Sequence, residues 1–267
     1  MNKNKVTVLD FAGKKEAGEK ITMLTAYDYS MAKLIDSVGV DSVLVGDSLA
    51  MVALGYDSTI PVTMDEMIHH SKAVRRGVER AFLIGDMPFM SFQVSDEDAV
   101  LNAGRFVKEA GCEAVKIEGG GEVSSRVKAI TGAGIPVVGH IGLTPQSVNK
   151  LGGYKVQGKD AESGKRLLED ALSLEKAGVF AVILECVPKD LARRITSKLS
   201  IPTIGIGAGE YCDGQVLVAH DIVGYFEKFV PKFVKQYANI SSTIKEALTK
   251  FKEETESGAF PDDEHSF

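Results

Sequence analysis

Short apolar runs recur along the chain, and most are followed by a polar or glycine stop and then by an amphipathic stretch. Bounded by turn-forming residues, these runs predict β-strands at 21–27, 42–46, 81–85, 114–118, 135–140, 181–185, 201–206 and 215–220. Helical spacing of apolar residues predicts helices between them, as at 30–39, 96–111 and 162–178. Strands and helices therefore alternate along most of the chain.

The ends of the predicted helices carry their own signals. Thr63 stands three residues before Glu66, which is the spacing of a capping box at a helix start. Glycine follows the last periodic residue of several predicted helices, at Gly39, Gly111 and Gly178. These signals support the helix boundaries that the apolar pattern predicts.

Eight strands alternating with helices predict an α/β fold with a parallel sheet, and eight strands are the number that closes a (β/α)8 TIM-type barrel. An open doubly wound sheet is the alternative, but it more often carries a glycine fingerprint after its first strand, and TAYDYS (25–30) has no glycine. We therefore expect a single barrel domain over residues 1–267. Flanking helices are expected within 1–20 and 241–258.

Composition narrows the class of protein. With 44% hydrophobic and 25% charged residues the chain resembles an ordinary soluble globule, and a net charge of −6 argues against a nucleic-acid partner. The three cysteines show no CxxC spacing, which favours a reducing compartment over disulfides or a thiolate zinc site. Neither a signal-peptide core nor an apolar run of membrane-spanning length is present. We expect a cytoplasmic protein with no membrane partner.

Acidic residues stand where four of the predicted strands end, at Asp47, Asp86, Glu118 and Glu185. In a barrel these ends share the face on which active sites are built. Four converging carboxylates repel one another unless protons or a cation neutralise them, and an all-oxygen cluster suits Mg²⁺, with Mn²⁺ or Co²⁺ as substitutes. Any one of these acids alone is more often a helix cap or turn former.

Lys116 lies inside the run 114–118, two residues before Glu118, so both side chains point to one face of the strand. Burying two charges costs several kcal/mol per ion, which calls for an explanation. Lys116 could offset the negative charge of the acidic cluster. It could instead form a structural ion pair, or act as a Schiff-base lysine with a lowered pKa.

Long stretches of the chain, from about residue 21 to the closing EHSF, resemble the ketopantoate hydroxymethyltransferase family. The resemblance lies in TAYDYS (25–30), VGDSLAMVALGYDSTIPVTMDEM (45–67), GDMPFMSF (85–92), VKIEGG (115–120), GHIGLTPQSVNKLGGYKVQG (139–158), LECVP (184–188) and IPTIGIGAG (201–209). Several of these blocks are long and specific, which argues against a chance match.

The resemblance implies a (β/α)8 enzyme with one Mg²⁺ per subunit that assembles as a homo-oligomer, typically a decamer. It implies transfer of a hydroxymethyl unit from 5,10-methylenetetrahydrofolate to 3-methyl-2-oxobutanoate, through an enolate stabilised by the metal. The product would be 2-dehydropantoate, in the first step of the pantoate branch of pantothenate and coenzyme A biosynthesis.

The resemblance also implies roles for individual residues, carried over through the matching motifs. The metal-associated carboxylates would be Asp47, Asp86 and Glu118. The contacts to the 2-oxoacid would come from Asp47, Ser48, Asp86 and Lys116, with Lys116 also catalytic and Glu185 as the proton acceptor. One departure is Ala50, where the family pattern leads us to expect glycine, and alanine would be strained there if the backbone needed a positive φ.

The sequence alone leaves the roles of three other features open. The glycine-containing loop GGYKVQG (152–158) could be a lid or a folate-side loop, or a surface loop with an interface role. The run GIGAG (205–209) could hold an anion or form a tight turn. His140 could orient a substrate or serve as a hydrogen-bonded structural histidine.

Other functions of a barrel with these residues are a carbon–carbon lyase or phosphonate mutase, a Schiff-base aldolase using Lys116, and a silent barrel that only binds a metabolite. Lyases and mutases of this kind commonly carry a reactive cysteine in a lid, and GGYKVQG (152–158) has none. The presence of an acid, a base, a lysine and metal-type ligands disfavours the silent barrel.

Overall fold

The computed structural model describes residues 5–267. The chain divides into two compact units. The first unit ends at Val218, and the second comprises Ala219–Phe267. The expectation of one domain over 1–267 stays a prediction, and its first four residues lie outside the described part of the chain.

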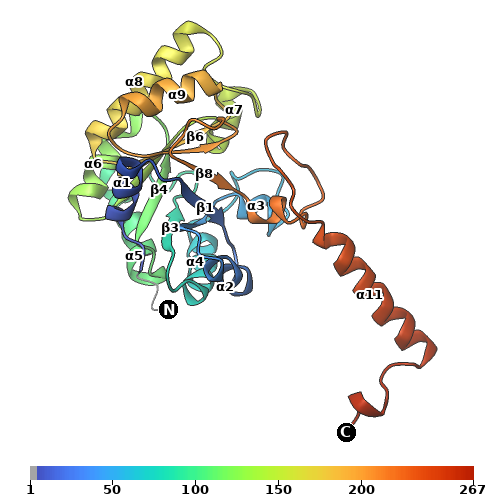
Figure 1. The fold of residues 1–267 in the computed structure, drawn as a ribbon. Helices are drawn as coiled ribbons and strands as arrows, with labels where there is room; N and C mark the ends of the chain where they lie inside the picture. The colour runs from blue at the N-terminus through green and yellow to red at the C-terminus, as the bar shows by residue number, and fades with distance from the viewer. Residues whose placement is uncertain (1–4) are drawn as a thin grey trace. The chain divides into compact units, whose positions relative to one another are not determined.

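Eight parallel strands of the first unit close into a barrel in which each strand pairs with its neighbours in sequence order (Figure 1). They are β1 (Ile21–Thr25), β2 (Ser42–Val45), β3 (Phe82–Asp86), β4 (Ala114–Glu118), β5 (Val137–Gly142), β6 (Ala181–Glu185), β7 (Thr203–Ile206) and β8 (Gly214–Leu217). The pairing of β1 with β8 completes the circle, so the predicted (β/α)8 barrel is confirmed and an open sheet is excluded. The last predicted run, 215–220, is wrong at its end, because helix begins at Ala219.

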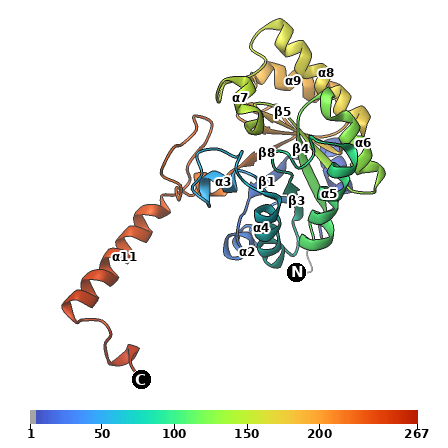
Figure 2. The same ribbon diagram turned by 180° about the vertical axis from the view of Figure 1, so that it is seen from behind.

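Helices surround the strands of this unit, as the two opposite views show (Figures 1 and 2). They are α1 (Val8–Ala17), α2 (Tyr29–Ser37), α3 (Leu49–Val52), α4 (Met64–Gly77), α5 (Asp96–Ala110), α6 (Ser124–Gly132), α7 (Val148–Leu151), α8 (Ala161–Ala177) and α9 (Lys189–Lys198), with 3₁₀ turns η1 (Gly121–Val123) and η2 (Pro145–Ser147). The capping box predicted at the start of α4 is present, since Thr63 and Glu66 each accept a backbone N–H from the other. Gly111 and Gly178 end α5 and α8 with positive φ, as expected.

The second unit contains α10 (Ala219–Ile222), α11 (Ile240–Ser257) and the 3₁₀ turn η3 (Asp263–His265). Helix α11 confirms the helix expected within 241–258, and α1 confirms the one expected within 1–20. None of the helices described between residues 5 and 267 combines the length and apolar character needed to cross a membrane.

Apolar side chains fill the interior of the barrel below the C-terminal ends of the strands. Met23, Leu44 and Ile84 belong to this buried cluster together with residues of the other strands. The ring of Phe11, from α1, packs edge-on against Phe82 at 5.5 Å between centroids and belongs to the same cluster. Helix α1 therefore closes one end of the barrel and leaves the C-terminal ends of the strands for chemistry.

Asp41 anchors α1 to the segment that leads into β2. Its carboxylate accepts hydrogen bonds from the backbone N–H of Thr22 at 2.8 Å and from the Thr22 hydroxyl at 2.9 Å. Its other oxygen lies 2.7 Å from the ammonium of Lys14 in α1. One buried carboxylate thereby ties together a helix and two strands.

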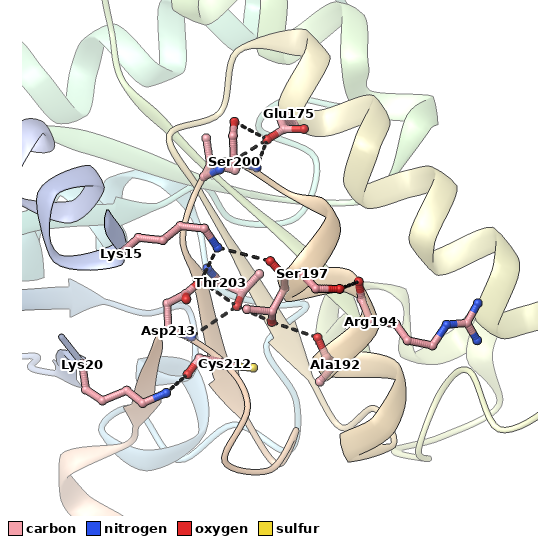
Figure 3. Close-up of polar contacts among 12 residues, drawn as sticks. Lys15, Lys20, Glu175, Ala192, Arg194, Ser197, Ser200, Thr203, Cys212 and Asp213 are labelled. Carbon is pink, nitrogen blue, oxygen red and sulfur yellow. Dashed lines mark hydrogen bonds and ion pairs between the residues drawn. The ribbon is translucent and has the colours of Figure 1, made fainter. Parts of the chain in front are cut away.

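The same arrangement recurs before β8, where Asp213 accepts the N–H and the hydroxyl of Thr203 and pairs with Lys15 at 2.8 Å (Figure 3). The Thr203 hydroxyl also lies 2.7 Å from that of Thr196 in α9. Adjacent lysines of α1 thus bind two separate strand junctions, which fixes α1 against the barrel.

We predict that Asp41→Asn lowers the free energy of unfolding by about 1.5–3 kcal/mol, the usual worth of hydrogen bonds to a charged group. Burial acts to raise the pKa of Asp41, but the bonds from Lys14 and Thr22 outweigh it and lower that pKa. The stabilisation is therefore present above the unfolded pKa of about 3.9 and is lost as pH falls through the lower folded pKa.

Urea unfolding followed by circular dichroism at pH 7 and at decreasing pH measures this difference. Asp190→Asn, which removes an exposed ion pair with Arg193, is the control and should change stability by less than about 0.5 kcal/mol. Equal stability of Asp41→Asn and the wild type at pH 7 would contradict the role of Asp41.

Candidate active site

The acidic residues at the strand ends continue the inward-facing rows of the barrel strands. In β3, Ile84 belongs to the barrel core, and Asp86 two residues later points to the same side. In β4 the corresponding row runs from Ala114 through Lys116 to Glu118, and all three are buried. Strand alternation therefore carries these charged groups into the mouth of the barrel, above an apolar floor.

Lys116 lies among the acids, and only 3% of its surface is exposed. Its ammonium is 2.9 Å from Oδ1 of Asp86, 3.5 Å from Oε1 of Glu118 and 3.1 Å from Nδ1 of His140. A buried charge is tolerated when it is paired and hydrogen-bonded in this way. The charged pair in the β4 run thus belongs to a larger charge cluster.

Asp47 follows β2 and is buried beside Asp86, whose Oδ2 accepts the Asp47 backbone N–H at 2.9 Å. Burial raises the pKa of Asp47 well above its ordinary value, and the charges of Asp86 and Glu118 raise it further, although Lys116 acts in the opposite direction. Asp47 therefore carries the least compensated charge of the three carboxylates.

The other two carboxylates, Asp86 and Glu118, differ in how far nearby positive charge offsets the effect of burial on their pKa values. Burial raises the pKa of Asp86 above its ordinary value despite the charge of Lys116. Burial also acts to raise the pKa of Glu118, but Lys116 and His140 outweigh it and bring that pKa below its usual value. Burial acts to lower the pKa of Lys116, but Asp86 and Glu118 raise it above the ordinary value, so the side chain is a firmly held ammonium.

His140 joins the β4 acid to the β6 acid. Its Nδ1 is 3.4 Å from Oε1 of Glu118, and its Nε2 is 3.0 Å from Oε2 of Glu185, although the latter contact lacks hydrogen-bond geometry. Burial and the charge of Lys116 act to lower the pKa of His140, but the two glutamates raise it to about 9. His140 therefore belongs to the charge cluster, a placement that its sequence position alone left open.

Ser48 lies directly after Asp47, and its hydroxyl is 2.8 Å from that of Tyr27. Ala50, in α3, donates its N–H to the carbonyl of Asp47 at 2.9 Å. Ala50 is not among the residues with positive φ, so the strain considered for alanine at this site does not arise.

Gln146 is a residue of the site that the sequence reasoning missed. It lies on the 3₁₀ turn after β5, where its backbone N–H donates to Oε2 of Glu118 and its side-chain amide donates to Oδ2 of Asp47, both at 3.0 Å. One signal in the sequence could have indicated Gln146. Thr144-Pro145 marks a helix start after the fifth strand, so the next residue lies near the C-terminal end of that strand.

The loop 152–158 lies close to the acids. Its Tyr154 has a pKa raised by burial and by the charges of Asp47, Glu185 and Glu118. Gln157 donates its N–H to the carbonyl of Cys186 at 2.9 Å, which attaches the loop beside Glu185. Whether this loop acts as a lid stays a prediction. The run 205–209 contains two glycines with positive φ, as a tight turn requires.

A cavity of about 430 Å³ begins where β4 and β5 end. Its lining includes Gly119, Gly142, Thr144, Lys150, Gln157, Arg166 and Asp170. Ile141 also lines it, next to His140 in β5, so by strand alternation this part of the cavity lies on the helix side of the sheet. The cavity reaches the charge cluster at the strand ends, where Gly119 follows Glu118 and Gly142 pairs with Glu185.

The charge balance of the cluster tests whether a metal ion fits. Among residues 5–267, no three or more His, Cys, Asp or Glu side chains are arranged as a ready-made metal site. However, Mg²⁺ usually takes only one or two protein carboxylates and keeps its other positions for water and substrate. The four strand-end carboxylates exceed the two basic groups, Lys116 and His140, so the donor set and the surplus negative charge fit a divalent cation.

Comparison with known proteins shows the family to which the chain belongs. The sequence model of the family described as ketopantoate hydroxymethyltransferase matches residues 5–263. Proteins named 3-methyl-2-oxobutanoate hydroxymethyltransferase are 60% identical in Syntrophus aciditrophicus, covering 98% of this chain and 97% of that protein, and 59% identical in Syntrophomonas wolfei, covering 98% and 95%.

Solved structures share the fold at much lower identity. A phosphonopyruvate hydrolase superposes with a TM-score of 0.64 at 13% identity, covering 98% of this chain and 91% of that one. A phosphoenolpyruvate phosphomutase from Streptomyces platensis subsp. rosaceus gives 0.60 at 16% identity, covering 92% and 88%. These likenesses show the fold alone, whereas the sequence matches cover nearly the whole chain: the chain belongs to the ketopantoate hydroxymethyltransferase family.

Proposed function

We propose that the protein transfers a hydroxymethyl unit from 5,10-methylenetetrahydrofolate to 3-methyl-2-oxobutanoate, giving 2-dehydropantoate for pantothenate and coenzyme A biosynthesis. The observation that carries the proposal is the buried cluster of Asp47, Asp86 and Glu118 around Lys116, in a chain of this family. This cluster combines a fixed positive charge with surplus carboxylates, which suits a small acid that must lose a proton from carbon.

Proton removal is the first chemical step in this proposal. The 2-oxoacid lies in the barrel mouth with its oxygens towards Lys116 and Ser48. Glu185 takes the proton from carbon 3, and the charge that develops on the ketone oxygen is stabilised by the Lys116 ammonium in a site of low water content. His140, 3.0 Å from Glu185 and 3.4 Å from Glu118, holds the base in position.

Carbon–carbon bond formation follows. Carbon 3 of the enolate bonds to the methylene carbon of the folate donor, and water supplies the hydroxyl oxygen, while both bonds from that carbon to the folate nitrogens break. One nitrogen takes up the proton that Glu185 removed, and the other takes up a proton from the water. The balanced change is oxoacid plus methylenetetrahydrofolate plus water to 2-dehydropantoate plus tetrahydrofolate. No oxidant or reductant is required.

A divalent cation, proposed as Mg²⁺ with Mn²⁺ or Co²⁺ as substitutes, would be held by Asp47 and Asp86, with Glu118 nearby. When bound, it would supply Lewis-acid polarisation of the substrate ketone. The adjacency of the first two carboxylates and the uncompensated charge of Asp47 support this assignment.

The Schiff-base alternative for Lys116 is disfavoured. A nucleophilic lysine needs a lowered pKa, whereas Asp86 and Glu118 raise the pKa of Lys116. The decameric assembly stays a prediction based on the family resemblance, and the cytoplasmic location stays a prediction based on the composition and the cysteine pattern.

We place the folate donor in the cavity beside the cluster. The cavity lies next to Glu118 and Glu185 through Gly119 and Gly142, which are their chain and strand neighbours. Lys150 and Arg166 could pair with the acidic tail of folate.

The direct test of the mechanism is deuterium exchange at carbon 3 of 3-methyl-2-oxobutanoate, followed by NMR in D₂O with Mg²⁺. Glu185→Gln should slow exchange by about 10²–10⁴-fold, the typical worth of a positioned base, while oxoacid binding measured by calorimetry stays near that of the wild type. Glu169→Gln, on the exposed face of α8, is the control and should exchange normally. Unchanged exchange in Glu185→Gln would remove Glu185 from the role of base.

Metal dependence tests the carboxylate assignment. EDTA should abolish exchange in the wild type, and Asp86→Asn should raise the Mg²⁺ concentration for half-maximal exchange at least about tenfold, since even outer partners of metal sites are typically worth about 10–100-fold. Titrating Mg²⁺ into the assay measures this. An Asp86→Asn variant that responds to Mg²⁺ like the wild type and like Asp190→Asn would refute the assignment.

Binding of the folate donor can be tested separately from proton exchange. Lys150→Ala should raise the KM for methylenetetrahydrofolate several-fold in the complete reaction and leave deuterium exchange of the oxoacid alone unchanged, because exchange does not need the donor. Lys165→Ala, an exposed lysine outside the cavity, is the control. An unchanged KM in Lys150→Ala would argue against this placement of the donor.

A further inference from the structure

Gln146 contacts two of the three clustered carboxylates and is itself only 4% exposed. Its main chain and its side chain bind different acids: the backbone N–H donates to Oε2 of Glu118, and Nε2 donates to Oδ2 of Asp47. One residue on the turn after β5 thereby links the ends of β2 and β4, which are not neighbours in the barrel.

The orientation of the Gln146 amide is determined by its surroundings. Nε2 also donates to the backbone carbonyl of Met87 at 2.9 Å, so both amide hydrogens are directed at acceptors. A flipped amide would place Oε1 against the Asp47 carboxylate and the Met87 carbonyl, and both contacts would become repulsive. The side chain is therefore held as a double donor.

The same orientation leaves Oε1 of Gln146 buried and without a hydrogen-bond partner among residues 5–267. A buried acceptor without a partner costs free energy unless a water or a ligand hydroxyl supplies a donor. Oε1 can therefore accept a hydrogen bond from a water or substrate group in the site.

Asp47 depends on the hydrogen bond from Gln146 for its orientation. It is buried beside Asp86 and near Glu118, while the Lys116 ammonium is closest to Asp86. The Gln146 amide fixes the direction of Oδ2 of Asp47, and without it the carboxylate could turn away from Asp86. That rotation would remove a correctly placed oxygen from the site.

We propose that Gln146 is a positioning residue that fixes the orientation of the Asp47 carboxylate in the site. Its side chain acts through Asp47, whereas its backbone contact with Glu118 is independent of the side chain. The role deepens the function proposed above and rests on it for the activity readout.

Two substitutions test this role. Gln146→Met keeps the approximate size of the side chain but removes both donors, and Gln146→Glu keeps the shape but places a second carboxylate against Asp47. Both retain the backbone N–H to Glu118. We expect the Mg²⁺ concentration for half-maximal deuterium exchange to rise about tenfold in Gln146→Met and further in Gln146→Glu. Gln215→Met, an exposed glutamine of β8 that also donates to a carbonyl, is the control and should behave as wild type.

A double-mutant cycle with Asp47→Asn separates positioning from general stability. Mn²⁺ affinity is measured by calorimetry for the wild type, each single variant and the double variant, and folding is followed by thermal melting. If Gln146 acts through Asp47, Gln146→Met weakens Mn²⁺ binding in the wild-type background and changes it less than about twofold in the Asp47→Asn background. Equal losses in both backgrounds, or wild-type Mn²⁺ affinity in Gln146→Met, would overturn the proposal.

The two proposals fail in different ways. A wild-type protein that binds Mn²⁺ but does not exchange the oxoacid proton would contradict the proposed function, and the coupling of Gln146 to Asp47 would still be measurable. A wild type that exchanges normally, together with a Gln146→Met variant of wild-type Mg²⁺ dependence, would contradict only the role of Gln146. If Gln146→Met does not fold, Gln146→Leu, which also removes both side-chain donors and keeps the backbone N–H, gives the same comparison.

Discussion

The ion pair between Lys116 and Asp86 is the interaction on which the rest of the site depends. It places a positive charge 2.9 Å from a carboxylate in a position where neither group meets bulk water. Burying each ion alone would cost several kcal/mol, and removing one partner would leave the other uncompensated. Lys116 also contacts Glu118 and His140. The free-energy cost of burying the charges, and the attraction that offsets it, are therefore spread over the whole cluster.

The barrel fold brings these charged side chains together. Strand alternation places core residues and site residues on the same inward face, so the apolar floor that stabilises the fold also lowers the local dielectric around the acids. Closure of the sheet sets β2 and β6 on opposite sides, so Asp47 and Glu185 approach the site from opposite directions. Helix α1 closes the other end of the barrel through Phe11 and Lys14, which leaves the C-terminal mouth free.

Barrels of similar shape at 13–16% identity include a phosphonopyruvate hydrolase and a phosphoenolpyruvate phosphomutase. A shared fold of this kind does not determine the reaction, because chemistry depends on the side chains at the strand ends and on the loops that follow them. Here the loop after β5 carries both Gln146 and Tyr154 towards the acids.

The sequence by itself predicted the alternation of strands and helices, the closed barrel, and Asp47, Asp86, Lys116, Glu118 and Glu185 at or near the strand ends. These features follow from local periodicity, since a strand that alternates must send every second residue to the same face. Strand ends were less certain: the run 215–220 continued the apolar pattern, yet the chain turns to helix at Ala219.

Only the tertiary structure decided the contacts among these residues. Gln146 carries no charge and no periodic signal, and its role arises because a turn after β5 reaches Asp47, which is 99 residues away in sequence. Whether Lys116 is a nucleophile or a paired ammonium, and whether His140 belongs to the site, likewise depended on distances across strands. Local sequence determines which face a side chain takes, but burial and neighbouring charges from distant segments determine its protonation and its partners.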